Sequence, residues 1–329
     1  MTDKATIIAK LPTIYDVAKA AGVSPATVSR VFNGQNVSPA KIESVLKAAA
    51  EMSFVPNRTA RNLRRRQSEV IALIIPDIEN PFFTSLARGV EDTAQHNGYS
   101  VVLCNSDEDQ AKEIHYLWIA ASESMAGVII AAAGNEIDLA PLGDRPVVAV
   151  DRRVVGFKGD SVTVNGSLGM FEATRALAEA GYKRIALLAG PEKMATSVDR
   201  VRGWSRVQGH APELLRYTDF RIKSGRTAIL ELLELDNPPD AIVASNNMLG
   251  LAAVQELGRV GLLPPQIGLS ILGELPFEFD PPEGAFIIPL NARSLGSTAT
   301  RLLIDRVNGD ESPPRKILLP DLLESALMQ

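Results

Sequence analysis

The chain has 329 residues, 46% of them hydrophobic, and a formal net charge of -5 at pH 7. This length is enough for two or three globular domains, and neither an export signal nor an apolar run long enough for a bilayer span is recognisable. The chain has a single cysteine, Cys104, which excludes an internal disulfide framework. With only three histidines beside it, a Cys/His metal site is not expected. We therefore expect a cytoplasmic globular protein without a membrane segment, metal or cofactor.

The charge is distributed unevenly along the chain. Residues 1–67 hold 11 Lys and Arg against 4 Asp and Glu, which leaves 23 against 35 of the totals of 34 and 39. The first segment therefore carries +7 and the remainder -12. A basic block on an acidic body indicates that one end meets a polyanion, although a solvated basic tail would give the same count.

The first apolar patterns predict two short helices joined by a glycine turn. Thr13 is a suitable N-cap for the first helix, and Gly22 suits the left-handed turn that ends it. Ser24 and Pro25 then begin a second helix that ends at Phe32. Such a pair is typical of a helix-turn-helix, and an ordinary helical hairpin is the alternative.

A third helix is predicted from Ser38–Pro39 onward, and it closes a three-helix core. Its expected apolar face consists of Ile42, Val45, Leu46 and Ala49. In a helix-turn-helix the start of the second helix contacts base edges in the major groove, where Arg30 can pair with guanine. Pro25 and Ala26 offer only apolar or steric contact. Arg30 is therefore the leading candidate for base reading.

The segment 56–67, "PNRTARNLRRRQ", surrounds Leu63 with five arginines. Asn57 can cap a helix here, but about two and a half turns are too few for a stable isolated helix. Phosphates would relieve the repulsion between Arg61 and Arg65, and Leu63 could enter a base step as a wedge. We expect folding coupled to DNA binding, with two alternatives: a basic interdomain linker, or Leu63 packed on the third helix.

The stretches "TIYDVAKAAGVSPATVSRVFNG" and "FVPNRTARNL" resemble the headpiece and hinge of the lactose-repressor (LacI/GalR) family of bacterial transcription regulators. "IALIIPDIENPFF", "GYKRIALLAGP" and "AIVASNN" are similar to the periplasmic-binding-protein-like core of that family. The resemblance extends over nearly the whole chain. It implies that the hinge helix is disordered when free and folds where two copies meet in the DNA minor groove. The predicted DNA contacts are Thr13, Tyr15, Ser24, Pro25, Ala26, Thr27, Ser29, Arg30, Asn33, Asn57, Arg58, Ala60, Arg61 and Leu63.

From residue 70 onward, short apolar runs alternate with helical stretches. The first half has apolar runs at 70–76, 100–105, 126–133 and 146–151, with helices at 82–97 and 111–122. After Asp151 the pattern restarts with a strand at 161–165, which predicts two similar halves of an α/β protein with parallel sheets and helices on both faces. The second half then has apolar runs at 184–190, 241–245 and 269–272 and helices ending at 180 and covering 197–207, 225–235 and 248–260.

The resemblance predicts a domain division. It assigns residues 1–55 to a helix-turn-helix headpiece, 56–67 to a hinge helix and 68–329 to an effector-binding and dimerisation core. The chain would cross between the two halves of the core three times, with residues 294–308 returning to the first half. The subdomains are expected at 68–163 plus 292–315 and at 164–291 plus 316–329.

Ligands of such sheets bind beyond the carboxyl ends of the strands, here in the cleft between the halves. The residues at these ends match positions that contact effector in members of the family: Asp77, Asn80, Phe82, Asp151, Arg200, Phe220, Asn246 and Glu274. For each polar member a helix cap or a turn is an equally good interpretation. "LGELPFEFDPP" departs from the aspartates usual after the last cleft strand, the stretch after Trp204 is short, and Asn247 replaces a common aspartate. We therefore expect an unusual effector.

The predicted function is a homodimeric transcriptional regulator, most simply a repressor of carbohydrate-utilisation genes. Its partners would be double-stranded DNA with a pseudo-palindromic operator and a sugar or sugar acid as effector. A nucleoside or purine effector and a co-repressor mode are the alternatives. A solute-binding protein is disfavoured because no export signal precedes the basic segment. An enzyme is disfavoured because G-x-G-x-x-G, P-loop and G-x-S-x-G motifs are missing.

Overall fold

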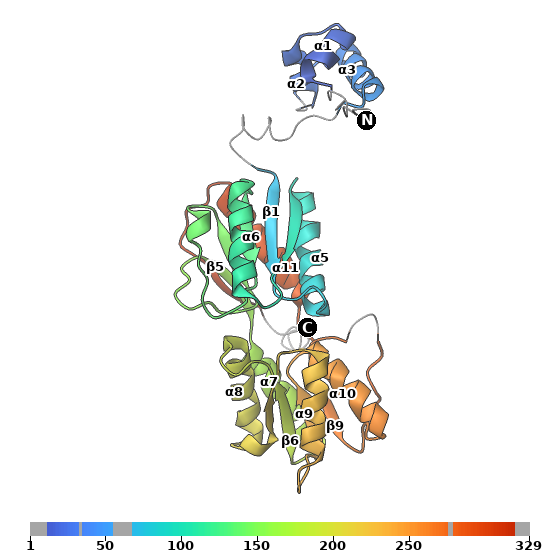
Figure 1. Ribbon diagram of the computed structural model, residues 1–329, viewed down its shortest axis with the longest axis vertical. Helices are drawn as coiled ribbons and strands as arrows, with labels where there is room; N and C mark the ends of the chain where they lie inside the picture. Colours follow the sequence, from blue (N-terminus) through green and yellow to red (C-terminus); the bar gives the residue numbers. More distant parts are fainter. Residues whose placement is uncertain (1–11, 33–34, 55–67, 276–278, 320–329) are drawn as a thin grey trace, which may run out of the picture. The chain divides into compact units, whose positions relative to one another are not determined.

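The computed structural model describes residues 12–32, 35–54, 68–275 and 279–319, and the chain divides into two compact units, Met1–Gln67 and Ser68–Gln329. The predicted hinge, 56–67, lies outside the described residues. The first unit contains α1 (Ile14–Ala21), α2 (Pro25–Phe32) and α3 (Pro39–Glu51) (Figure 1). Within the described residues, no helix is both long and apolar enough to cross a membrane.

Local signals set the ends of the first helices. The Thr13 amide donates to Asp16 Oδ2 at 2.8 Å, and the Thr13 hydroxyl contacts the same oxygen at 2.6 Å. This capping box holds the N-terminal turn of α1. Gly22 ends the helix in the left-handed region at φ 63°, and the Thr27 amide donates to Ser24 Oγ at 3.2 Å. The predicted N-caps and glycine turn are confirmed.

The three helices enclose a small apolar core. Its fully enclosed members are Val17, Ala18, Val28, Val45, Ala48 and Ala49. The prediction for α3 was wrong at Leu46, which is 49% exposed, whereas Ala48 is buried. Val45, Ala48 and Ala49 are spaced i, i+3 and i+4, so they share one face of a helix, and Leu46 lies about 100° away around the axis.

The second unit contains a six-stranded sheet in the order β11–β5–β4–β3–β1–β2, and every pair of neighbouring strands is parallel. The strands are β1 (Val70–Ile75), β2 (Ser100–Asn105), β3 (Gly127–Ile130), β4 (Val147–Val150), β5 (Asp160–Val164) and β11 (Lys316–Leu319). Its helices are α5 (Pro81–His96), α6 (Gln110–Ser122) and α11 (Ala292–Val307), with a 3-10 turn at Ala140–Leu142.

Helices cover both faces of this sheet. α5 and α11 pack against one face and α6 against the other, and Figure 1 shows α6 in front of the sheet with α11 behind it. Between these layers all but the first residue of β1 are buried. A strand buried on both faces is expected to read as a continuous apolar run, which is the pattern of "VIALII".

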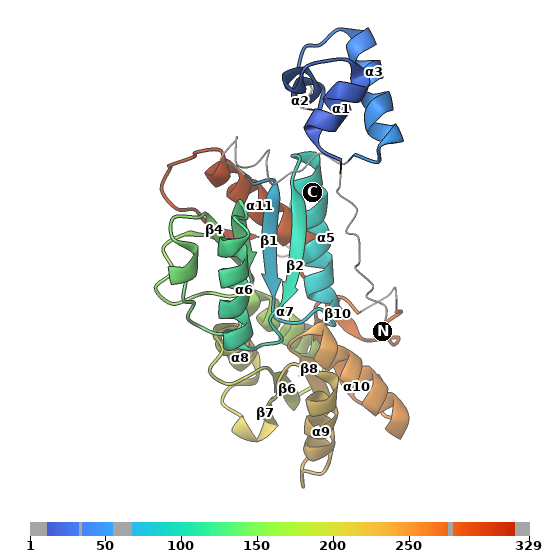
Figure 2. The ribbon, with the colours of Figure 1, turned by 45° about the horizontal axis from the view of Figure 1, so that its top comes forward.

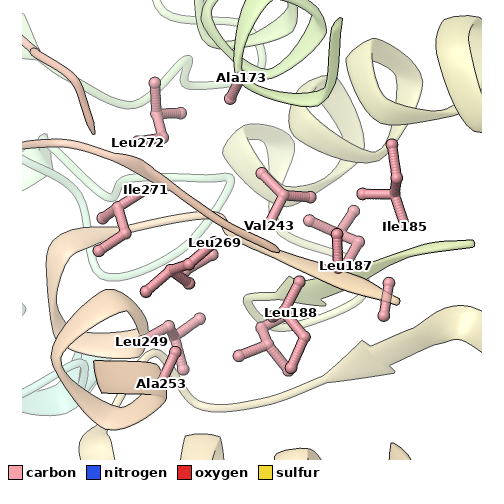
Figure 3. Close-up of a cluster of buried hydrophobic side chains, with 14 of the residues drawn as sticks. Ala173, Ile185, Leu187, Leu188, Val243, Leu249, Ala253, Leu269, Ile271 and Leu272 are labelled. Atoms are coloured by element: carbon pink, nitrogen blue, oxygen red, sulfur yellow. The ribbon is translucent and has the colours of Figure 1, made fainter. Parts of the chain in front are cut away.

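The same unit contains a second parallel sheet, of five strands, in the order β10–β9–β8–β6–β7. Its strands are β6 (Ile185–Ala189), β7 (Leu215–Tyr217), β8 (Ala241–Ala244), β9 (Gly268–Leu272) and β10 (Phe286–Ile288). Its helices are α7 (Gly166–Glu179), α8 (Ala195–Gln208), α9 (Ile222–Leu233) and α10 (Asn247–Val260), with a 3-10 turn at Pro212–Leu214. Figure 3 shows Ala173 of α7 on one side of the strands and Leu249 and Ala253 of α10 on the other.

One of the predicted assignments to the halves was wrong. The pattern restarts with the strand at 161–165, and the expected boundary at 163 assigned most of this strand to the first subdomain, where β5 does pair with β4. Residues 316–329 were assigned to the second subdomain, but β11 pairs with β5 and also belongs to the first sheet. The register Lys316↔Ser161 to Leu319↔Val164 decides this, and a single sequence does not reveal strand pairing. Within the described residues the chain crosses between the sheets twice, after β5 and before α11.

Candidate functional site

The first unit offers an exposed surface at the helix-turn-helix. Arg30 and Ala26 on α2 are exposed, and Tyr15 on α1 is 71% exposed. Pro25, Thr27 and Ser29 are partly exposed, so none of these side chains is buried in the core. Thr13 and Ser24 also cap helices, as described above. The remaining predicted DNA contacts lie outside the described residues: Asn33, Asn57, Arg58, Ala60, Arg61 and Leu63.

The second unit contains a cleft where the carboxyl ends of both sheets meet. In Figure 2 the arrowheads of β1 and β2 point toward the second sheet. The space in the cleft, open solvent included, is about 600 Å³, and about 40 Å³ of it can hold the centre of a water-sized sphere. All eight residues selected from the sequence line it: Asp77, Asn80, Phe82, Asp151, Arg200, Phe220, Asn246 and Glu274. Six separate segments of the chain therefore converge on one pocket, in the arrangement expected for parallel sheets.

Further residues of the pocket were missed. They are Phe83, Glu108, Arg152, Thr196, Asp219, Arg221, Asn247, Leu272, Gly273 and Leu290. Several are immediate chain neighbours of selected residues, so the "DRR" after β4 and the "DFR" before α9 could have indicated Arg152, Asp219 and Arg221. Glu108 lies in a loop with no such signal. It enters the pocket because the loop after β2 is bonded to the end of β1, where the Glu108 amide donates to the Pro76 carbonyl at 3.0 Å, and its carboxylate reaches Arg152 after β4.

A buried donor and a buried acceptor without partners stand out in the pocket. Asp151 is 8% exposed and Arg200 is 6% exposed. Within the described part of the chain, Asp151 Oδ1 and Arg200 Nε have no hydrogen-bond partner. A buried polar group without a partner costs about 1–3 kcal/mol, so native proteins rarely retain one without a role. These two atoms therefore point to a ligand that supplies the missing bonds.

The titration behaviour of these groups follows from the same burial. Burial raises the pKa of Asp151, against the opposing charges of Arg152 and Arg200. Burial likewise lowers the pKa of the Arg200 guanidinium. Burial also raises the pKa of Asp77 and of Glu274. Perturbed ionisable groups in a cleft are a mark of a functional site.

Arg152 is buried next to Asp151, but its charge is matched. Its Nη1 and Nη2 each donate to one carboxylate oxygen of Glu108 at 2.6 Å, and Nη1 also donates to the Ala132 carbonyl at 2.7 Å. Burial by itself would lower the pKa of Arg152, but the Glu108 hydrogen bonds and charge raise it. The bidentate pair fixes the guanidinium at the floor of the pocket.

Aromatic rings form the apolar walls. Phe82 and Phe83 lie edge to face at 5.1 Å between ring centroids, and the Arg200 guanidinium lies 5.7 Å from the Phe220 ring centroid. Phe220 has φ 66° and Asp151 has φ 63°, a left-handed conformation that is uncommon for residues other than glycine. Backbone strain at two pocket residues indicates that their side-chain positions matter.

Asn80 and Asn246 are helix caps as well as pocket residues. Asn80 Oδ1 accepts from the Phe82 amide at 3.0 Å at the start of α5. Asn246 Oδ1 accepts from the Leu249 amide at 2.8 Å, and its Nδ2 donates to the Phe220 carbonyl at 3.3 Å. For these two residues the cap interpretation is confirmed. It leaves the Asn80 amide nitrogen available to a ligand.

Direct contacts join the two rims of the cleft. Arg221 donates to Asp107 at 2.8 Å, and Arg153 donates to Asp199 at 2.6 Å. Asn135 Nδ2 donates to the Lys193 carbonyl at 2.6 Å, while its Oδ1 accepts from the Ala195 amide at 3.0 Å. These contacts hold the two halves in one arrangement around the pocket.

Comparisons with known proteins agree with this architecture. The family model of "Periplasmic binding proteins and sugar binding domain of LacI family" matches residues 68–326, and that of "Bacterial regulatory proteins, lacI family" matches residues 13–57. The chain belongs to the lactose-repressor family. It is a DNA-binding transcriptional regulator with an effector-binding core, and its fold is the predicted headpiece followed by a periplasmic-binding-protein-like core.

Individual relatives match this regulator over almost their full length. The ribose operon repressor of Bacillus subtilis (strain 168) is 34% identical over 321 residues, which cover 94% of this chain and 96% of the relative. The solved complex of the transcriptional regulator CelR with cellobiose is 28% identical with a TM-score of 0.69, covering 94% and 97%. The lac repressor dimer bound to operator and the anti-inducer ONPF has a TM-score of 0.82 at 24% identity with the same coverage, a likeness of fold alone. These relatives are regulators rather than enzymes.

Proposed function

We propose that this regulator is a homodimeric repressor of carbohydrate-utilisation genes, whose affinity for a pseudo-palindromic operator changes when a sugar occupies the cleft. The observation that carries the proposal is the buried, unpaired pair of Asp151 Oδ1 and Arg200 Nε in the core of a DNA-binding regulator. The names of the ribose operon repressor and of the CelR–cellobiose complex support a sugar. The protein acts in the cytoplasm and catalyses no reaction.

On the DNA side, the start of α2 enters the major groove. Arg30 reads a guanine, and Pro25 and Ala26 fit against neighbouring base edges. The other polar contacts hold the DNA backbone. The segment 56–67, which connects the headpiece to the core, binds the minor groove with Leu63 as a wedge. The proposed division into headpiece, hinge and core at 55/56 and 67/68 follows from these roles.

The coupling between pocket and operator requires a ligand that distinguishes two arrangements of the core. The contacts across the cleft, such as Arg221 to Asp107, are the bonds that would be remade as the halves close or rotate. A coupling of about 1–3 kcal/mol changes operator affinity about 5- to 150-fold, which is sufficient for regulation.

The test is a titration of full-length protein against duplexes selected from a random library, with and without sugars. Arg200→Ala is expected to abolish the effect of the sugar while leaving sugar-free operator affinity within about twofold, because Arg200 contacts the ligand and not the DNA. Arg206→Ala is the matched control, since Arg206 is exposed on the same helix and does not line the pocket. A sugar response that survives Arg200→Ala would remove Arg200 from the site.

The same duplexes test the proposed base contact. Arg30→Ala is expected to cost about 1–3 kcal/mol on the preferred duplex and to relax the preference at one base pair per half-site. Lys47→Ala, an exposed cation on α3, should instead weaken every sequence uniformly or not at all. Equal weakening of all operator variants by Arg30→Ala would contradict base reading by this residue.

A further inference from the structure

Acidic side chains outnumber basic ones in the cleft. The lining includes five carboxylates and three guanidinium groups: Asp77, Glu108, Asp151, Asp219 and Glu274 against Arg152, Arg200 and Arg221. An anionic ligand therefore enters a pocket with an excess of negative charge. Whether it could still bind depends on how many of the three cations are available to it.

Two of the three cations already have carboxylate partners. Glu108 holds Arg152 through two hydrogen bonds of 2.6 Å, and Asp107 holds Arg221 through one of 2.8 Å. A ligand carboxylate or phosphate would have to displace one of these carboxylates or remain close to it. The Arg152 guanidinium is therefore not an open anion site, and the charge of Arg221 is partly neutralised.

Amides at two helix N-termini of the cleft are occupied as well. At the start of α5, Pro81 has no amide hydrogen and the Phe82 amide donates to Asn80. At the start of α10, the Met248 amide donates to Asn247 at 3.1 Å and the Leu249 amide donates to Asn246 at 2.8 Å. Free amides at a helix N-terminus usually bind anions, and here side-chain oxygens occupy these donors.

Arg200 remains, and its environment defines the ligand chemistry. Its unpaired Nε is a buried donor, and the unpaired Oδ1 of Asp151, which lines the same pocket, is a buried acceptor. A hydroxyl group both donates and accepts, so a pair of hydroxyls satisfies both atoms. An ionised carboxylate could satisfy Arg200 but has no proton to give Asp151 and adds a like charge beside it. The rings of Phe82 and Phe220 can cover the apolar face of a sugar ring.

We propose that the cleft selects an uncharged polyhydroxy ligand and rejects the carboxylate and phosphate forms of the same skeleton. This inference rests on the proposed function, because it names the class of effector for that site. It narrows the sequence expectation of a sugar or sugar acid to neutral sugars and polyols. Asp151 sets this preference, since it faces the ligand with an unshared acceptor.

The experiment measures binding of full-length protein by calorimetry and by the rise in melting temperature, using compounds matched in skeleton and differing in charge. The sets are ribose, ribonate and ribose 5-phosphate; glucose, gluconate and glucose 6-phosphate; and adenosine with adenosine monophosphate. Neutral disaccharides and polyols extend the panel. For each skeleton that binds, we expect the anionic form to bind on the order of 100-fold more weakly, the size of effect typical of like charges brought together.

Asp151→Asn tests the residue that sets the preference. Asparagine keeps an acceptor oxygen and tolerates the left-handed conformation of position 151, so the fold is expected to survive. Removal of the charge should lower the ratio between the affinity for a neutral compound and that for its anionic form by at least about tenfold. Glu123→Gln is the charge-matched control, because Glu123 is exposed at the end of α6 and does not line the pocket. It should leave the ratio unchanged.

The outcomes separate this inference from the proposed function. Equal or tighter binding of a sugar acid or sugar phosphate would overturn the inference and leave a carbohydrate effector intact. Binding of adenosine without its monophosphate, and of no sugar, would support the charge preference and contradict the sugar. An unchanged ratio in Asp151→Asn would contradict the role of Asp151, and failure of every neutral compound to bind would count against both proposals.

Discussion

A buried aspartate lies at each end of the six-stranded sheet. Within the described residues, the protein supplies hydrogen-bond partners to one of them and leaves an oxygen of the other without a partner. Asp160 begins β5 and is 2% exposed, while Asp151 follows β4 and is 8% exposed. Asp160 accepts from Arg306 Nε at 2.7 Å, from Arg306 Nη2 at 3.0 Å and from the Arg315 amide at 2.6 Å. In the described part of the chain, Asp151 has one cation within 4.0 Å, Arg152 with its Nε at 3.8 Å, and one oxygen without a hydrogen-bond partner.

This difference separates a structural charge from a ligand-binding one. At the amino end of the sheet every bond that Asp160 needs is supplied by the protein, so the carboxylate fixes β5, α11 and β11 together. At the carboxyl end the protein leaves the bonds of Asp151 open. Burial alone therefore does not identify a functional residue, whereas burial without partners does.

Substitution of the two aspartates should give the largest contrast. Asp160→Asn removes the charged partner of the partly buried Arg306 guanidinium and is expected to lower the free energy of unfolding by about 1–3 kcal/mol. Asp151→Asn removes a buried charge with an unpaired oxygen and should leave the free energy of unfolding unchanged or raise it, because burial disfavours the ionised carboxylate. Chemical denaturation of the ligand-free protein measures both. Equal losses would show that the two aspartates have the same role.

The pH dependence of unfolding sharpens the same contrast. Burial alone would raise the pKa of Asp160, but the hydrogen bonds from Arg306 and Arg315 and their charges hold it below its ordinary value of 3.8. Its contribution is therefore present above pH 3.8 and is lost as the pH falls through the folded-state pKa. The pKa of Asp151 is raised by burial, so its ionisation above that pKa opposes folding. Asp160→Asn should weaken the fall in the free energy of unfolding as the pH is lowered, whereas Asp151→Asn should not.

A smaller effect is expected from the wall of the pocket. A Cβ added at Gly190 would lie 1.9 Å from Phe220 Cζ, and the backbone there has no positive φ, so the clash concerns the ring. Gly190→Ala should displace the Phe220 ring, cost about 1–3 kcal/mol of stability and weaken sugar binding. Gly258→Ala on α10, where the added Cβ would meet only Leu263 at 3.7 Å, is the control and should stabilise the protein slightly. Unaltered sugar affinity in Gly190→Ala would exclude the ring from the site.

The smallest effect is expected at the rim. Asp199 bridges Arg153 at 2.6 Å and Arg202 at 3.2 Å, but 62% and 64% of these arginine side chains are exposed. Such ion pairs contribute about 0–1 kcal/mol, so Asp199→Asn should lower the free energy of unfolding by less than about 1 kcal/mol. A larger loss, measured by chemical denaturation, would show that the rim contacts hold the halves together more strongly than their exposure implies.

Features that depend on residues close in the chain were predictable. The caps at Thr13 and Ser24, the glycine turn and the apolar strands follow from local chemistry, and the structure reproduces them. Leu46 was wrongly predicted to be buried, because α3 has apolar residues on two adjacent faces and the pattern does not say which one packs. β7 and β10 were missed because runs of three residues give no period to detect.

The pocket residues were found in part, for a related reason. A parallel sheet brings its strand ends to one edge, so residues just after β1, β4, β8 and β9 could be selected from the pattern and the family resemblance. Glu108 could not, because its place beside Arg152 depends on packing between segments 44 positions apart.

By itself the sequence determined the class of protein: a basic helix-turn-helix unit followed by an acidic α/β core with a ligand cleft. The tertiary structure decided which strands join which sheet, which arginines already have carboxylate partners and which buried atoms lack them. The reason is that helix caps and strand periodicity are properties of neighbours in the chain. Strand register and the completion of a hydrogen bond are properties of atoms brought together only by folding.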